Sequence, residues 1–141
     1  MEEKEKEAQE AYMQFQMFDQ QIKIMQKQLE VITQHLMEIA VTSNGLDEFE
    51  KAKPGKEIFV PISSGIFAKA ILKDNSELLV NVGANTVIVK DLKSTKMLIS
   101  NQAEEMKKVQ KNLVDELNKM ISQAGELELR LQGMMSGLES S

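Results

Sequence analysis

The sequence predicts an α+β protein in which a long antiparallel coiled coil carries two β-hairpins at one end. In two separate tracts, apolar residues recur at alternating spacings of three and four, the pattern of a coiled-coil seam. Between these tracts, residues 57–90 contain short runs rich in Val and Ile that turn residues interrupt. The tracts are about equally long, so folding one back along the other would bring both ends of the chain together.

The first coiled-coil segment is expected at residues 1–46. Its predicted seam consists of Phe15, Phe18, Ile22, Met25, Leu29, Ile32, Leu36 and Ile39, with Ala8 and Ala11 continuing the register toward the amino end. Ser43-Asn44-Gly45 is the expected helix end because Gly suits the left-handed position just after a helix. Leu46 keeps the register, which allows one further turn. Residues 45–56, with Pro54-Gly55, then form a linker.

Residues 57–90 are expected to form four strands, at 57–62, 66–72, 77–82 and 86–90, joined as two hairpins within one sheet. The last turn requires positive φ, which Gly83 adopts freely and Asn85 tolerates. Both faces of the sheet carry apolar side chains, which is an aggregation hazard unless something covers them. Either the helices of the same chain or other subunits could do so. We favour other subunits because the helices pack on each other. The predicted oligomerisation residues are Ile58, Val60, Ile66, Phe67, Ile71, Leu78, Val80, Val82, Val87 and Val89.

The second coiled-coil segment is expected at residues 91–141, with Asp91 as the N-cap of its helix. The predicted seam consists of Ile99, Ala103, Met106, Gln110, Leu113, Leu117, Met120, Ala124, Leu127, Leu131, Met134 and Leu138. Gln110 is its one polar member, and such a residue usually fixes register rather than adding stability.

Apolar residues outside the seam gather near the two ends of the chain, where antiparallel pairing makes them neighbours. Three interpretations are open. The group is an ordinary wide apolar stripe of a helix, a contact between the coiled-coil arms of different subunits, or an adaptable binding surface rich in flexible Met side chains. The residues predicted to bind unfolded chains at this end, some of them drawn from the seam, are Tyr12, Met13, Leu131, Met134, Met135 and Leu138.

Composition argues against several classes of function. The 141 residues fit one modest domain, and the absence of Cys removes disulfides, thiolate nucleophiles and Cys-based metal sites. The net charge of −5 disfavours nucleic acid as a partner. His35 is the only histidine, and no nucleotide-binding, metalloprotease or hydrolase motif occurs, so we expect no enzyme, no cofactor and no metal. The charged amino terminus is not a signal peptide and no run spans a membrane, so a cytoplasmic location is expected.

The order helix, double hairpin, helix resembles the alpha-class subunit of prefoldin. The specific similarity lies in Val60-Pro61-Ile62-Ser63-Ser64-Gly65-Ile66-Phe67 and in Val82-Gly83-Ala84, which resemble the family's hairpin segments. Ser63 and Asn85 depart from the family pattern at positions where Gly is common. Two hairpins rather than one favour the alpha class over the beta class.

This resemblance implies an ATP-independent chaperone. Alpha subunits would pair with a second copy through their hairpins and join beta-type subunits in a hexamer whose hairpins form intersubunit β-barrels. The coiled-coil tips would hold unfolded client proteins and pass them to a group II chaperonin. The alternatives are a structural scaffold or filament built from the same parts and an arm that grips RNA, which the acidic charge disfavours.

Overall fold

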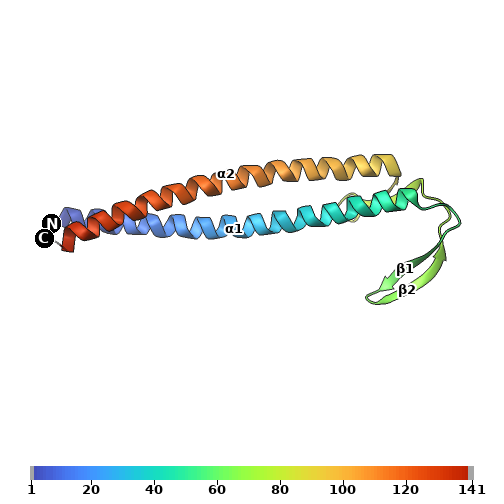
Figure 1. The fold of residues 1–141 in the computed structure, drawn as a ribbon, viewed down its shortest axis with the longest axis horizontal. Coiled ribbons are helices and arrows are strands. Elements are labelled where there is room, and N and C mark those ends of the chain that lie inside the picture. The colour runs from blue at the N-terminus through green and yellow to red at the C-terminus, as the bar shows by residue number, and fades with distance from the viewer. Residues whose placement is uncertain (1, 140–141) are drawn as a thin grey trace. The chain divides into compact units, whose positions relative to one another are not determined.

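The computed structural model describes residues 2–139, with side chains up to residue 137, as two long helices that flank four strands (Figure 1). The predicted α+β class is confirmed. In chain order the elements are α1 (Glu2–Lys51), β1 (Glu57–Ser63), β2 (Ile66–Ile71), β3 (Glu77–Asn81), β4 (Val87–Asp91) and α2 (Leu92–Glu139). The chain divides into two compact units. Unit 1 combines Met1–His35 with Met106–Ser141, and unit 2 is Leu36–Glu105.

In unit 1, α1 and α2 run antiparallel and share the predicted seam. Every seam residue whose side chain is described there is buried or half-buried, whereas most other side chains are exposed. The buried ones are Ala8, Ala11, Met25, Leu117, Ala124 and Leu127. The Gln110 amide donates a hydrogen bond to the Thr33 hydroxyl across the helix pair, at 3.4 Å. The polar residue of the seam therefore has a partner on the facing helix, which fits its expected role in register.

In unit 2, α1 continues through Gly45 and ends at Lys51, so the expected helix end at Gly45 is wrong and the further turn that Leu46 allowed is confirmed. The backbone of Gly45 keeps a negative φ, and the half-buried Leu46 and Phe49 extend the apolar stripe by another turn. Packing of these side chains outweighs the local stop signal. The helix ends two residues before Lys53, and Pro54 keeps it from continuing, since a proline disfavours helical backbone in the residue before it.

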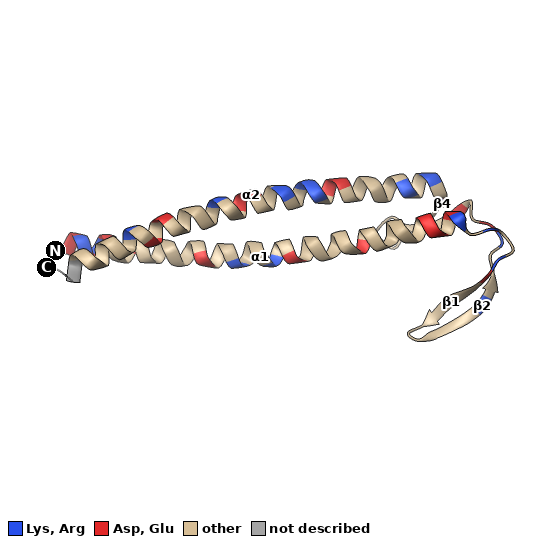
Figure 2. Cartoon of the chain, viewed as in Figure 1, with Lys and Arg blue, Asp and Glu red and all other residues tan. Residues whose placement is uncertain are grey.

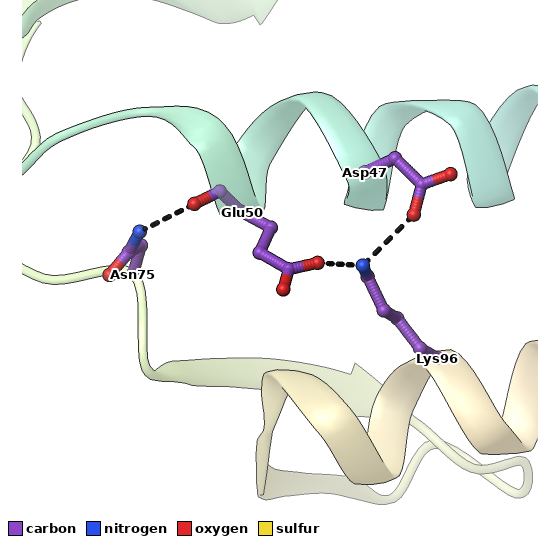
Figure 3. Close-up of polar contacts among 4 residues, drawn as sticks. All are labelled: Asp47, Glu50, Asn75 and Lys96. Carbon is purple, nitrogen blue, oxygen red and sulfur yellow. Dashed lines mark hydrogen bonds and ion pairs between the residues drawn. The ribbon is translucent and has the colours of Figure 1, made fainter.

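Side chains from three segments hold the end of α1 (Figure 3). The Asn75 amide donates hydrogen bonds to the backbone carbonyls of Glu50 and Ala52, at 3.2 and 2.8 Å. Carbonyls in the last turn of a helix have no partner within the helix, so Asn75 satisfies two groups that would otherwise need water. The Lys96 ammonium pairs with the carboxylates of Asp47, at 2.9 Å, and Glu50. These contacts join the end of α1, the β2–β3 connection and the start of α2.

The strands form two separate two-stranded antiparallel sheets, β1–β2 and β3–β4, so the expectation of one four-stranded sheet is wrong for the single chain. Strand bounds agree with the prediction to within one residue. The connection between the hairpins explains the difference. The backbone of Leu72 exchanges hydrogen bonds with Gly55 and Lys56 at the base of the first hairpin, and Ser76 accepts one from Leu92 at the start of α2. These bonds fix both hairpins at their bases and leave β2 and β3 unpaired with each other.

The turn between β3 and β4 contains three consecutive residues with positive φ: Gly83 at 104°, Ala84 at 50° and Asn85 at 59°. The expectation for Gly83 and Asn85 is confirmed. Ala84 was not foreseen, because a left-handed conformation costs a residue with a Cβ about 1–2 kcal/mol. The Asn81 side chain accepts a hydrogen bond from the Gly83 amide, at 2.9 Å, which helps to hold the turn.

Asp91 caps α2, as predicted. Its carboxylate accepts a hydrogen bond from the backbone amide of Ser94, at 2.6 Å, and its backbone carbonyl accepts one from the Thr95 hydroxyl, at 2.8 Å. The Ser94 backbone amide, followed by the Ser94 side chain, lowers the pKa of Asp91 because both hydrogen bonds favour the charged carboxylate.

Replacing Leu117 by Ala should destabilise the coiled coil by roughly 2–5 kcal/mol, because shortening a buried side chain of the seam leaves a cavity. Leu117 is 7% exposed. Val31→Ala is the matched control, since Val31 lies outside the seam and is 70% exposed. Thermal unfolding followed by circular dichroism measures both variants. Equal unfolding curves for the two would contradict the seam assignment.

The cap at Asp91 predicts a pH-dependent stability. Because the folded-state pKa lies below the unfolded value of about 3.9, the cap stabilises the fold above that value and is lost as pH falls through the folded pKa. Asp91→Ala should therefore melt below the wild type at pH 7, with a difference that shrinks in strong acid. Asp91→Asn keeps an acceptor that does not titrate, so its difference from Asp91→Ala should stay constant with pH. A wild-type advantage over Asp91→Ala that persisted unchanged in strong acid would refute the assignment.

Candidate functional site

The hairpin β1–β2 has one half-buried and one exposed face. Ile58 pairs with Ala70 and Val60 with Ala68, and three of these four side chains are half-buried. On the other face Phe59, Phe67 and Ile71 are all more than half exposed, although Glu57 and Lys69 form an ion pair there, at 3.0 Å. Figure 2 shows how few charged residues this hairpin carries. Two strands cannot cover this apolar face themselves.

The hairpin β3–β4 repeats this arrangement. Leu78 and Val80 are half-buried on one face, where they pair with Lys90 and Ile88. Leu79 lies opposite Val89 on the other face, and at 75% Leu79 has the largest exposed fraction among the exposed large apolar residues. We call the exposed apolar residues of both hairpins the hairpin surface: Phe59, Val60, Ile62, Ile66, Phe67, Ile71, Leu79, Val82, Val87, Ile88 and Val89.

The predicted oligomerisation residues all lie on the hairpins or their turns, and seven of them belong to the hairpin surface. Ile58, Leu78 and Val80 are instead half-buried. The sequence reasoning missed Phe59, Ile62 and Leu79, which are among the most exposed. The alternation along each strand, which puts neighbouring residues on opposite faces, was the signal that could have found them.

A groove of about 1000 Å³ lies in unit 1 beside the first turns of α1 and the last turns of α2, between residues 5–15 and 128–136. We call it the tip groove. It lies between α1 and α2, and its lining is Glu5, Ala8, Gln9, Tyr12, Met13, Phe15, Glu128, Leu131, Gln132, Met135 and Ser136. The contributing residues recur every three or four positions on each helix, which places them on one face. The small side chains of Ala8 and Ser136 leave room between the larger ones.

The structure brings four predicted tip residues together in this groove: Tyr12, Met13, Leu131 and Met135. Tyr12, Met13 and Met135 are more than half exposed, and Leu131 is half-buried. Met134 is half-buried in the seam and does not line the groove. The side chain of Leu138 lies outside the described residues. Ala8 and Phe15 also line the groove, and the sequence reasoning had assigned both to the seam alone.

A second groove of about 710 Å³ lies in unit 1 near its boundary at His35 and Met106, and the sequence reasoning missed it. We call it the mid-arm groove. Ile24 and Val31 of α1 and Val109 of α2 line it, and all three are at least half exposed. The signal was present in the sequence, because Met17, Ile24 and Val31 repeat at seven-residue intervals outside the seam.

No helix in the described part of the chain is both long and apolar enough to cross a membrane. Among residues 2–137, no cluster of three or more His, Cys, Asp or Glu side chains is placed to hold a metal ion. Exposed apolar residues are numerous on both the hairpins and the helices.

A coiled coil with uncovered hairpins and an apolar groove defines a protein built for binding or assembly. The family model for the prefoldin subunit matches residues 18–135. The prefoldin alpha subunit of Methanobrevibacter smithii is 31% identical over 105 residues, which cover 74% of this chain and 66% of that protein. The alpha subunit of Methanococcus aeolicus is 24% identical over 133 residues, covering 94% of this chain and 90% of that one. A cryo-EM structure of filamentous PFD from Methanocaldococcus jannaschii has a similar fold, with a TM-score of 0.74 and 14% identity over 86% of this chain and 98% of that one.

The chain therefore belongs to the prefoldin family, a family of non-enzymatic chaperones. The curated relatives named above are alpha subunits, which confirms the class expected from the two hairpins.

Proposed function

We propose that this protein is a subunit of a cytoplasmic, ATP-independent chaperone that captures unfolded proteins in the tip groove. The observation that supports this proposal best is the groove itself, where exposed Tyr12, Met13 and Met135 surround a hollow of about 1000 Å³. An unfolded client offers scattered apolar side chains, and burying one Met or Leu contributes about 1.5–3 kcal/mol. A single contact is weak and is released easily.

Several coiled-coil arms, each formed by α1 and α2 of one subunit, would make such weak contacts effective if they acted on one client together. Once one arm holds a segment, the neighbouring arms meet the rest of the chain at a high effective concentration. We propose that the hairpin surface supplies this multivalency, since its apolar faces are uncovered in the single chain and its strand edges are open to pairing. In this proposal a second copy of the chain and beta-type prefoldin subunits complete an intersubunit β-barrel.

Delivery of the client to a group II chaperonin is the further step that we propose. It rests on membership of the prefoldin family. A holder that binds through shared weak contacts can give up its client whenever a partner offers a larger apolar surface.

A structural role as a scaffold or filament is the second candidate. The solved structure with the similar fold is of a filamentous assembly, and the hairpin surface of this chain would suit repeated contacts between copies. The two candidates make different demands on the tip groove, because a scaffold does not need it.

Removing the apolar walls of the tip groove should abolish client protection without disrupting assembly. The variant combines Tyr12→Ser, Met13→Ser and Met135→Ser, all at exposed positions. Its matched control, Ile24→Ser with Val31→Ser and Val109→Ser, removes the same number of exposed apolar side chains from the mid-arm groove. Light scattering of a denatured protein diluted into the assembled complex measures protection, and size-exclusion chromatography checks assembly. Full protection by the tip variant would place client binding outside the tip groove and overturn this proposal, whereas a wild-type complex that protects no client would favour the scaffold.

Charged substitutions on the hairpin surface should dissociate the complex. Phe67→Asp with Leu79→Asp places carboxylates on two exposed apolar faces, and burying them in an interface would carry a large desolvation cost. Far-ultraviolet circular dichroism should show unchanged helicity, because neither side chain belongs to the seam. Val31→Asp with Val41→Asp puts the same charges on exposed positions of α1 and should leave the complex intact. Mass photometry distinguishes the two, and an intact Phe67→Asp/Leu79→Asp complex would exclude the hairpins as the assembly surface.

A further inference from the structure

We propose that the tip groove selects unfolded segments in which Lys or Arg alternates with large apolar residues. This inference rests on the proposed function and adds a chemical class of client to it. An apolar groove alone would accept any apolar segment. The tip groove differs because an acidic residue from each helix, Glu5 of α1 and Glu128 of α2, belongs to its lining.

The described lining of the tip groove contains two glutamates and no Lys or Arg. Its remaining polar residues, Gln9, Gln132 and Ser136, are neutral. The mid-arm groove has a different balance, since Lys27 and Glu116 both line it and offset each other. The same arm thus offers two apolar grooves of which only the tip groove has a net negative lining.

The surroundings of the tip groove reinforce this charge. Residues 2–14 and 124–137 contain seven glutamates against three basic residues, a net charge of −4 (Figure 2). The whole chain has a net charge of −5, so the rest of it is close to neutral. Since charges in water at about 0.1 M salt act over about 10 Å, this excess is felt at the tip and not along the arm.

A basic side chain fits a site of this kind in a specific way. The aliphatic stem of Lys or Arg can lie along Met13, Leu131 and Met135, while the charged head remains near the carboxylates and in water. The ring of Tyr12 offers a further favourable contact to a cation. An acidic client segment would instead bring like charges together, so the groove discriminates by repulsion as well as by attraction.

Fluorescence anisotropy with three labelled peptides tests the proposal on the complex that the full chain forms. The peptides share the same Leu and Phe residues and differ only in the residues between them, which are Lys, Gln or Glu. We expect the wild type to bind the Lys peptide about three- to tenfold more tightly than the Gln peptide at 50 mM salt, with the Glu peptide weakest. The difference should largely disappear at 500 mM salt.

Two variants separate the tip carboxylates from the overall charge. Glu5→Gln with Glu128→Gln should bring the three peptides to similar affinities, and Glu5→Lys with Glu128→Lys should reverse their order. Glu30→Gln with Glu105→Gln makes the same change in net charge at exposed positions outside both grooves and should leave the order unchanged. All four positions are exposed, so folding is preserved, which circular dichroism confirms.

The outcomes distinguish this inference from the proposed function. Equal affinity of the wild type for all three peptides, at a level that the Tyr12→Ser, Met13→Ser and Met135→Ser variant abolishes, would overturn the charge preference and leave the chaperone proposal standing. Loss of the preference in the Glu30→Gln and Glu105→Gln control would also overturn it, because the effect would then belong to net charge. Failure of every peptide to bind the wild type would overturn both.

Discussion

Two helices packed side by side share one line of contact, and that limit shapes each unit of this protein. The seam takes the apolar side chains at spacings of three and four, and nothing else lies between the helices to bury the rest. Among the described residues no large side chain is fully buried, and even the best-packed seam residues, such as Leu127 at 6%, keep some exposure. Many apolar residues outside the seam therefore remain exposed, among them Tyr12, Val31 and Leu79. The hairpin surface, the tip groove and the mid-arm groove all follow from this shortage of interior.

The end of α1 carries a similar shortage of partners, which the sequence resolves with polar side chains. The last carbonyls of a helix have no backbone donor within the helix. Asn75, twenty-five residues away from Glu50 along the chain, supplies donors to two of them, and Lys96 links the same turn to the start of α2. Hydrogen bonds of this kind add little net free energy each, but leaving the groups unpaired would cost more. A few polar contacts thus help to position the connection between the hairpins within unit 2.

Most of the fold could be predicted from the sequence because its signals are local and periodic. The seam and the strand bounds depend on residues close together in the chain, and both agree with the structure. The failures have a different origin. At Gly45 a local stop signal was outweighed by packing of Leu46 and Phe49, and the number of sheets depended on hydrogen bonds of Leu72 that no periodicity reveals. The tip groove was half predicted. Tyr12, Met13 and Met135 are apolar residues outside the seam, so the sequence pattern indicates another role for them. Ala8 and Phe15 belong to the seam and also line the groove, so the pattern indicates only their seam role.

The glycines of α2 have a consequence for how long a client would stay. A Cβ at Gly125 or Gly133 would meet no atom within 4 Å, so no close approach of α1 requires glycine at either position. Glycine costs a helix interior about 1 kcal/mol relative to Ala, because its backbone has more freedom to lose. Holding the end of α2 rigid around a client would cost the same backbone conformational entropy. This cost would lower the affinity for the client and shorten its residence time. Under the proposed function, this lower affinity would let the coiled coils exchange segments of a client continually, and release would need no ATP hydrolysis.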